Sequence, residues 1–408
     1  MREFFDIKGK LNIIKNFEQF NQVITLTDAV SFCEQLGLEF SRGKIEVLMA
    51  QKDFVAVGNK LIEPLKKGGA EVSPLLIEDN SALHTSIKIK SDEEIAACVV
   101  IGDSDLLNFA RYYASLNKVP CYAIPFTPHL EDLLKSYVLL KTQNLPAKIE
   151  VDCFKKICVD EKLITLSQNE SFAQAYISVI NKLTALIDYR INSYLSGQNV
   201  DNNLFEIVKN SINTVALLPK YENYKSAIIY SELVLCAVNS TSTMLEGTGE
   251  QVVNTALKLF APNMADSERG FLTFEKLSKI YHFYFSNDFS DLLVVADYHE
   301  DIKALEEYTK REKSYFSKKL KIPSENRRIL INLLLEKTRC DFKAETTTIL
   351  SVLKQVKKIY ENLSHKSKKG SKPSYKQVKN AITLSTYLTD KTSVLTLCRD
   401  AGILKCAN

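Results

Sequence analysis

The chain has 408 residues, of which 45% are hydrophobic and 25% charged, and its net charge is +4. This length allows two domains with cores of their own, and the composition is ordinary for a soluble globular protein. The charge is too small to identify a partner. The first ten residues, MREFFDIKGK, lack the apolar run of a signal peptide, and the apolar stretch 227–238 contains Glu232 and is too short to span a bilayer. We therefore expect a cytoplasmic protein without a membrane partner.

The cysteines predict reduced core thiols rather than disulfides or a zinc site. There are nine of them, an odd number, and most lie in apolar runs. Cys153 and Cys158 are too far apart for a CxxC pair, and neither Cys398 nor Cys406 has a partner at zinc spacing.

Short apolar runs alternate with helical patterns in the first part of the chain. Strands are predicted at 45–50, 96–102, 119–125 and 155–160, and helices at 59–72, closed by Gly68 and Gly69, and at 105–116. Strands that are apolar throughout and separated by helices indicate a parallel sheet covered on both faces. This part is predicted to be an α/β, Rossmann-like domain.

The apolar period changes to 3.6 residues from about Glu170 onward. Residues 172–195 keep one apolar face through Ile177, Ile180 and Leu183, and further helical patterns follow from Phe205 to the C-terminus. We predict an α/β domain over 1–168 and an all-helical domain over 169–408. In such a pairing, a small-molecule ligand is expected at the carboxyl ends of the strands, in the cleft between the domains.

The strand at 96–102 runs into a turn that resembles a phosphate-binding loop but carries acidic residues. Gly102 is followed by Asp103, Ser104 and Asp105. Carboxylates at a helix N-terminus are good caps and satisfy the N–H groups that a phosphate would otherwise use. A pyrophosphate would also meet like charge there, at a cost of about 1–4 kcal/mol for each pair of unit charges 4 Å apart.

Two lysine-rich stretches lie at 309–321 and 364–379. The second contains Gly370 and Pro373 and is interpreted as a mobile surface loop. A solvated charge run explains both stretches better than a nucleic-acid patch, because aromatic residues are sparse in them and the chain is nearly neutral. We assign neither stretch a partner.

Several motifs follow one another in the order of a known family. GDSDLLNFAR (102–111) stands at a glycine-rich turn, IPFT (124–127) is similar to VPT, and NKLTALIDYR (181–190) is similar to KxTAxxDW. GTGEQVVNTALKLF (247–260), MADSERGF (264–271) and DKTSVLTLCRDAGIL (390–404) follow. This order resembles the dehydroquinate synthase and iron-containing alcohol dehydrogenase superfamily, most closely its glycerol-1-phosphate dehydrogenase branch. The resemblance implies a nucleotide domain, a helical metal domain and possible assembly into homo-oligomers.

The resemblance also implies the site positions. NAD(P) would contact the turn and the VPT-like segment, through Gly102, Asp103, Ser104, Asp105, Asn108 and Thr127. The three metal-ligand positions of the family hold Ser178, Gln251 and Asp266 in place of one Asp and two His. Because this set lacks imidazole nitrogens, we expect no functional metal there, while NAD(P) stays possible.

The five histidines do not form a ligand pair at helical spacing. His84, His299 and His365 lie in polar segments, and His282 is flanked by aromatic residues and predicted to be a hydrogen-bonded core residue. His129 follows the VPT-like segment and is the candidate acid or base, with Lys182 as a second candidate catalytic residue. Lys182 and Asp188 are otherwise expected on a solvated helix face, joined by a salt bridge.

Three functional hypotheses remain. The chain is an active NAD(P)-dependent polyol or polyol-phosphate dehydrogenase, as the resemblance implies. It is a divergent, non-catalytic member that binds a small molecule or a partner. Or it is a metal-independent enzyme that uses His129, Asp266, Glu268 or Arg269. Loss of the glycine turn together with all three metal ligands favours the divergent member.

Overall fold

The structure is a computed structural model that describes residues 22–77, 94–141, 146–216, 224–287, 352–364, 372–388, 391–400 and 404. The chain divides into two compact units. Unit 1 runs to Ala175 and includes Leu218–Ser242, and unit 2 consists of Tyr176–Leu217 and Thr243–Asn408. No helix in the described ranges is long and apolar enough to cross a membrane.

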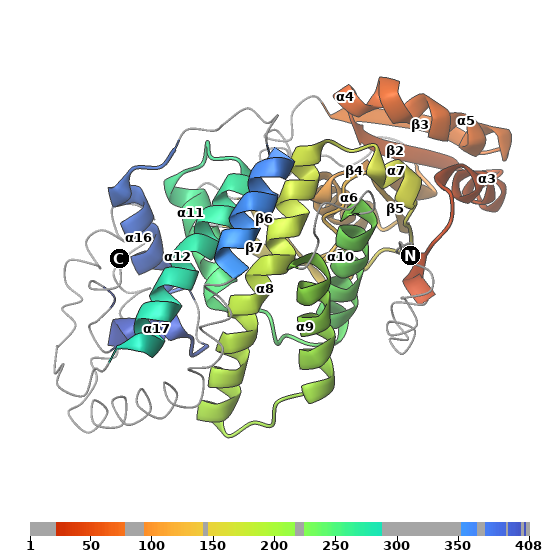
Figure 1. Cartoon of the computed structure of the whole chain (residues 1–408). Helices are drawn as coiled ribbons and strands as arrows, with labels where there is room; N and C mark the ends of the chain where they lie inside the picture. Colours follow the sequence, from red (N-terminus) through yellow and green to blue (C-terminus); the bar gives the residue numbers. More distant parts are fainter. Residues whose placement is uncertain are drawn as a thin grey trace, which may run out of the picture. The chain divides into compact units, whose positions relative to one another are not determined.

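Unit 1 contains a six-stranded parallel sheet in the order β1-β8-β5-β4-β2-β3 (Figure 1). Its strands are β1 (Ile24–Thr25), β2 (Lys44–Ala50), β3 (Glu71–Ile77), β4 (Ala97–Gly102), β5 (Cys121–Pro125) and β8 (Lys156–Cys158). Its helices include α3 (Ala29–Glu39), α4 (Gln51–Asp53), α5 (Asn59–Lys67), α6 (Ser104–Asn117), α7 (Glu161–Thr165) and α10 (Tyr224–Thr241), and a π-helical turn, η2, spans Phe54–Gly58.

The side chains of the central strands are buried on both faces of the sheet, because helices cover both faces. All six residues of β4 are buried. Val99 and Ile101 share a core with Phe32 of α3 and Leu65 of α5. The alternate residues Cys98 and Val100 point to the opposite face and are also buried. The predicted parallel sheet with two covered faces is confirmed.

Not every element of unit 1 was predicted. The expected helix at 59–72 ends at Lys67, and Gly68 is its C-terminal cap. Edge strand β3 then begins at Glu71 and pairs with β2, with Pro74 opposite Val47. The sequence does not indicate β3, because its side chains are only partly buried and it contains a proline, so its apolar signal is weak.

Arg111 of α6 connects the sheet to a second, two-stranded antiparallel sheet formed by β6 (Tyr137–Lys141) and β7 (Pro146–Glu150). Its guanidinium is 1% exposed and donates to the backbone oxygens of Asp152 at 3.2 Å, Tyr137 at 3.5 Å and Lys135. The guanidinium also lies over the ring of Phe154, 5.4 Å from its centroid. Arg111 therefore holds the chain on both sides of this hairpin.

Replacing Arg111 with Lys is expected to lower the free energy of unfolding by about 2–4 kcal/mol, because an ammonium cannot reproduce three planar donors and leaves buried carbonyls unpaired. Urea unfolding followed by circular dichroism measures this loss. The matched control is Arg190→Lys, since Arg190 lies over Phe205 at 5.5 Å and is only half-buried. Equal, small losses in the two variants would contradict the role assigned to Arg111.

Unit 2 is helical in its described residues, as predicted. Its helices are α8 (Asn169–Ser196, which begins in unit 1), α9 (Asn202–Ala216), α11 (Gly249–Phe260), α12 (Asp266–Ser286), a helix at 352–364, α16 (Tyr375–Ser385) and α17 (Val394–Asp400). A buried core joins α11, α12, α16 and α17 through residues such as Val253, Tyr281, Ala381 and Leu395.

The two units divide the chain differently from the predicted domains 1–168 and 169–408. Unit 1 continues to Ala175 and also includes the later segment Leu218–Ser242, which contains α10. Within unit 1, Lys225 Nζ donates to the Thr165 carbonyl at 2.8 Å, and Asn239 Nδ2 donates to the Glu131 carbonyl at 3.2 Å. An apolar period of 3.6 marks α10 as a helix but does not assign it to a unit.

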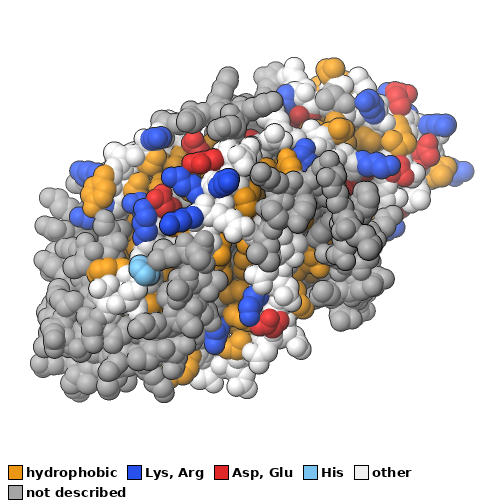
Figure 2. Space-filling model, viewed as in Figure 1, with side chains coloured by type: hydrophobic (Ala, Val, Ile, Leu, Met, Phe, Trp, Pro, Cys, Tyr) orange, Lys and Arg blue, Asp and Glu red, His pale blue; other side chains and the backbone are white. Residues whose placement is uncertain are grey.

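The second lysine-rich stretch is not a loop throughout. Residues 375–379 form the first turns of α16, which Ser374 begins with a reciprocal capping box to Gln377. Residues 365–371 and the whole of 309–321 lie outside the described ranges. On the face seen in Figure 2, basic and acidic side chains lie next to one another.

Six of the seven cysteines that the structure describes are buried in the core, as predicted. All seven are free thiols. Burial raises the pKa of Cys33 to about 12, which keeps that thiol protonated and unreactive. Cys340 and Cys406 lie outside the described residues.

Candidate functional site

The carboxyl ends of β4 and β5 bring the predicted nucleotide residues to one edge of the sheet. Gly102 pairs with Pro125 in the ladder, and the backbone N–H of Phe126 donates to the Gly102 carbonyl at 2.9 Å. Asp103 follows the first strand and Thr127 the second, so both lie at this edge. Thr127 Oγ1 is buried and accepts or donates no hydrogen bond among the described residues.

Asp103 accepts a hydrogen bond from a backbone N–H group that a bound phosphate would otherwise use. It is the N-cap of α6, and its Oδ1 accepts from the backbone N–H of Leu106 at 3.1 Å. Ser104 and the exposed Asp105 form the first turn, and Asn108 follows on the same helix. A Cβ added at Gly102 would lie 2.5 Å from Leu106 Cδ2, so the space beside this glycine is filled by Leu106. The prediction that acid caps this helix is confirmed for Asp103.

Further acid lies at the same edge. Asp53 ends α4, directly after β2, which is the neighbour of β4 in the sheet. Burial raises the pKa of Asp53, Lys52 lowers it, and the charge of Asp103 raises it again. Asp103 contributes to the raised pKa of Asp53 because like charges repel each other. This edge therefore favours neutral or cationic groups over a pyrophosphate.

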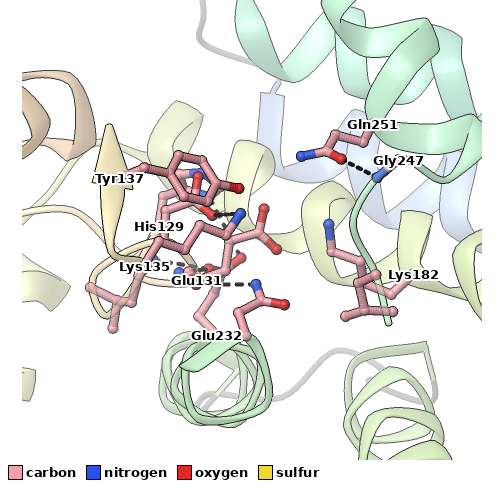
Figure 3. A network of polar contacts seen from close by, with 12 residues as sticks. His129, Glu131, Lys135, Tyr137, Lys182, Glu232, Gly247 and Gln251 are labelled. Atoms are coloured by element: carbon pink, nitrogen blue, oxygen red, sulfur yellow. Dashed lines mark hydrogen bonds and ion pairs between the residues drawn. The ribbon is translucent and has the colours of Figure 1, made fainter. Parts of the chain in front are cut away.

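His129 belongs to a polar group in unit 1 that joins the segment after β5 to α10 (Figure 3). His129 Nδ1 lies 3.7 Å from Glu232 Oε1, and the other carboxylate oxygen of Glu232 accepts from the backbone N–H groups of Leu130 at 2.9 Å and Glu131 at 3.0 Å. Asp132 forms an ion pair with Lys135. In the described part of the chain, His129, Glu131 and Asp132 are the one group of three or more His, Cys, Asp or Glu side chains whose ligand atoms lie within 4.8 Å of one another.

The charges of this group stabilise an imidazolium. Burial lowers the pKa of His129, but Glu232, Glu131 and Asp132 outweigh it and raise the pKa to about 10. Burial conversely raises the pKa of Glu232, while His129 lowers it. The Glu232 side chain is 0% exposed. Without a bound metal ion, His129 is therefore protonated at neutral pH and would serve as an acid or an electrostatic partner rather than as a free base.

Lys182 forms a buried ion pair in unit 2. Its Nζ lies 3.1 Å from Glu250 Oε2, and the two side chains are 6% and 7% exposed. The expectation that Lys182 and Asp188 lie on a solvated face and bond to each other is wrong. Both are buried, and each bonds to another helix. Both contact the start of α11, where Lys182 pairs with Glu250 and Asp188 accepts from the backbone N–H of Gly249.

Asp188 joins the N-termini of two helices. Its Oδ2 accepts from the backbone N–H of Gly249 at 2.7 Å and from the Tyr281 hydroxyl at 2.7 Å, and its Oδ1 accepts from the backbone N–H of Val394 at 2.9 Å. Burial raises the pKa of Asp188, the three donors lower it, and the result is about 6. Asp188 also lines a small pocket with Tyr189, Asn192, Met244, Thr248, Lys391 and Thr392.

The residues at the family's metal-ligand positions do not fit a transition metal. Gln251 uses its side-chain oxygen to accept from the backbone N–H of Gly247 at 2.6 Å, as Figure 3 shows. Asp266 forms an ion pair with Arg269 within the first turn of α12. Ser178 offers a neutral hydroxyl. This set has no imidazole, and its single carboxylate is already paired with a guanidinium.

Glu232 is a residue of this group that was not predicted as a site residue. In the sequence it is only a charged residue within an apolar stretch. A glutamate in the buried middle of a helix needs a partner, and that is the signal that could have identified it. Of the other histidines, His282 bonds to Ser286 at 3.2 Å on the surface of α12 rather than in the core, and His84, His299 and His365 lie outside the described residues.

Solved structures of iron-containing alcohol dehydrogenases share the fold of this chain. The enzyme from Thermococcus thioreducens gives a TM-score of 0.59 at 11% identity, over 94% of this chain and 97% of that one. An iron-containing alcohol dehydrogenase from Thermotoga maritima gives 0.57 at 10% identity, over 93% and 97%. The NADH-dependent butanol dehydrogenase A of the same organism gives 0.51 at 12% identity, over 93% and 90%. No protein-family model and no curated protein sequence matches. The chain therefore has the fold of the iron-containing alcohol dehydrogenases.

Proposed function

We propose that the chain is a divergent relative of the glycerol-1-phosphate dehydrogenases that has lost metal-dependent hydride transfer at the family's ligand positions and binds a small polar molecule. The observation that carries this proposal is the set of contacts that the residues at those three positions make. The side chain of Gln251 is bonded to the backbone N–H of Gly247 just before its own helix, Asp266 is paired with Arg269, and Ser178 carries no charge. In this respect the chain is a pseudoenzyme.

The carboxyl edge of the sheet in unit 1 is the binding place in this proposal. Thr127 Oγ1 has no hydrogen-bond partner among the described residues there, while Asp103 and Asp53 supply negative charge. Carboxylates and hydroxyls suit a polyol or a cationic amine, and they disfavour the pyrophosphate of a dinucleotide. We infer that the ligand is a polyhydroxylated or cationic molecule of small size.

An active NAD(P)-dependent dehydrogenase is the second candidate. The parallel sheet favours it, and so does the NADH dependence of a structural neighbour that spans 93% of this chain. The two candidates differ in nucleotide affinity, which can be measured directly.

Calorimetric titration of the purified chain with NADH and NADPH is expected to show no binding in the micromolar range. The Asp103→Asn variant is expected to bind NADH at least about fivefold more tightly than the parent, because one like charge is removed from the phosphate position. Asp201→Asn is the matched control, since Asp201 accepts from the backbone N–H of Leu204 at 3.1 Å at the start of α9 in unit 2.

Repeating the titrations with Zn²⁺, Mn²⁺ or Fe²⁺ present tests the family's chemistry. Micromolar NADH binding by the parent chain, with alcohol oxidation in the presence of one of these metals, would replace the proposed function by the second candidate. Equal NADH affinities of Asp103→Asn and Asp201→Asn would contradict the electrostatic argument on which the proposal depends.

A further inference from the structure

The polar group around His129 has the composition of a cation site. One imidazole and two carboxylates, from His129, Glu131 and Asp132, place their ligand atoms within 4.8 Å of one another. An ion bound about 2 Å from each ligand atom holds such atoms roughly 3–4 Å apart. Small rotations of half-buried side chains are enough to reach that geometry.

The buried Glu232 is a second, independent observation that points to a cation site. Its side chain is 0% exposed, and its Oε1 accepts no hydrogen bond from any described residue. Its Oε2 is held by the backbone N–H groups of Leu130 and Glu131, so the carboxylate is fixed against the segment that carries the three ligands. Oε1 lies 3.7 Å from His129 Nδ1, which is also buried and has no hydrogen-bond partner in the described ranges. A metal ion could bind both this buried carboxylate oxygen and the imidazole nitrogen, and the His129 proton would be released on binding.

The donor set selects the kind of cation. Imidazole nitrogen favours Zn²⁺ over Mg²⁺ and Ca²⁺, and carboxylate oxygens favour the harder Mn²⁺ over soft ions. No thiol of the described residues belongs to the group. The ammonium of Lys135, paired with Asp132, shows that the group already attracts positive charge.

We propose that His129, Glu131 and Asp132, with Glu232 as a fourth ligand, form a divalent-cation site of the Mn²⁺ or Zn²⁺ type in unit 1. The site is separate in the sequence from the family's ligand positions, all of which fall in unit 2. The cation would tie the segment after β5 to α10 and would lie at the edge of the sheet where Thr127 stands. The inference does not depend on the proposed function.

The experiment uses the full chain after treatment with a chelator and its removal. Mn²⁺ is the first probe because thiols bind it weakly, so the nine cysteines do not interfere, and its free form is counted by electron paramagnetic resonance. One Mn²⁺ per chain is expected to bind, with a Kd below about 100 µM, and to raise the melting temperature. Zn²⁺ is expected to compete for the same site, and Mg²⁺ to compete weakly.

The ligand variants are His129→Gln and Glu131→Gln, each expected to weaken Mn²⁺ binding at least about tenfold. Circular dichroism establishes that each variant is folded. If one variant does not fold, the Mn²⁺ affinity of the other tests the proposal. The matched control is His282→Gln, which removes a histidine from the surface of α12 and is expected to leave binding unchanged. Absence of Mn²⁺ and Zn²⁺ binding below 1 mM (about −4 kcal/mol) would overturn the proposal, and so would binding that both ligand variants retain.

Discussion

Replacing Lys182 with Met is expected to lower the free energy of unfolding by about 3–5 kcal/mol. The pair of Lys182 with Glu250 is 3.1 Å long and more than nine-tenths buried on both sides. Removing the ammonium leaves the Glu250 carboxylate in a poorly solvated place without the cation that faces it. Urea unfolding followed by circular dichroism measures the loss.

A double-mutant cycle separates a structural pair from a catalytic lysine. The variant Lys182→Met with Glu250→Gln is expected to recover at least half of the loss, because no buried charge remains. Lys279→Met is the matched control, since Lys279 pairs with Glu275 at 2.6 Å on an exposed face and such pairs contribute less than about 1 kcal/mol. If Lys182→Met is as stable as Lys279→Met, the pair does not stabilise the fold.

Replacing Asp188 with Ala is expected to lower the free energy of unfolding by about 3–5 kcal/mol. Three donors, the backbone N–H groups of Gly249 and Val394 and the hydroxyl of Tyr281, lose their acceptor in a buried place. Asp188→Asn is expected to cost about 1–3 kcal/mol, because its amide oxygen still serves the Gly249 and Tyr281 donors while its NH₂ faces the N–H of Val394.

The pH dependence of stability identifies the charge of Asp188. Its pKa in the folded chain is about 6, above its ordinary value of 3.8, so the folded state holds this proton more tightly than the unfolded state. The stabilisation is complete below pH 4 and is lost as the pH rises through 6, by about 3 kcal/mol. The difference in unfolding free energy between the parent chain and Asp188→Asn, measured from pH 4 to 7, should follow this decline. A difference that is constant with pH would contradict the raised pKa.

The sequence predicted the parts of the fold whose signal is local and apolar. Strands β2, β4, β5 and β8 are continuous apolar runs, and each was expected within a few residues of its observed bounds. The helix from Phe172 to Leu195 likewise shows its period over many turns. Edge strand β3 was not predicted because it is half-exposed, and the start of α16 was assigned to a loop although its capping box, Ser374 to Gln377, can be read from the sequence.

The candidate site was predictable only where one residue acts through its neighbours in the chain. Asp103 caps the helix that directly follows it, and this was expected. Lys182 and its partner Glu250 are 68 positions apart, the partners of Asp188 are 61 or more positions away, and His129 and Glu232 are 103 positions apart (232 − 129). Periodicity carries no information about such pairings. The buried partner of His129, Glu232, becomes apparent only when α10 is seen to pack in unit 1.

The membership of α10 in unit 1 also bears on how the protein is made. The sheet is complete in the sequence once β8 ends at Cys158, yet the helix that supplies Glu232 and Asn239 to the same unit lies beyond the first two helices of the other. During synthesis, unit 1 therefore cannot bury all of its apolar surface until Ser242 has left the ribosome. By then α8 and α9 have already been synthesised and have left the exit tunnel. The two units are interleaved in the order of synthesis, so neither can be finished as an independent piece before the other has begun.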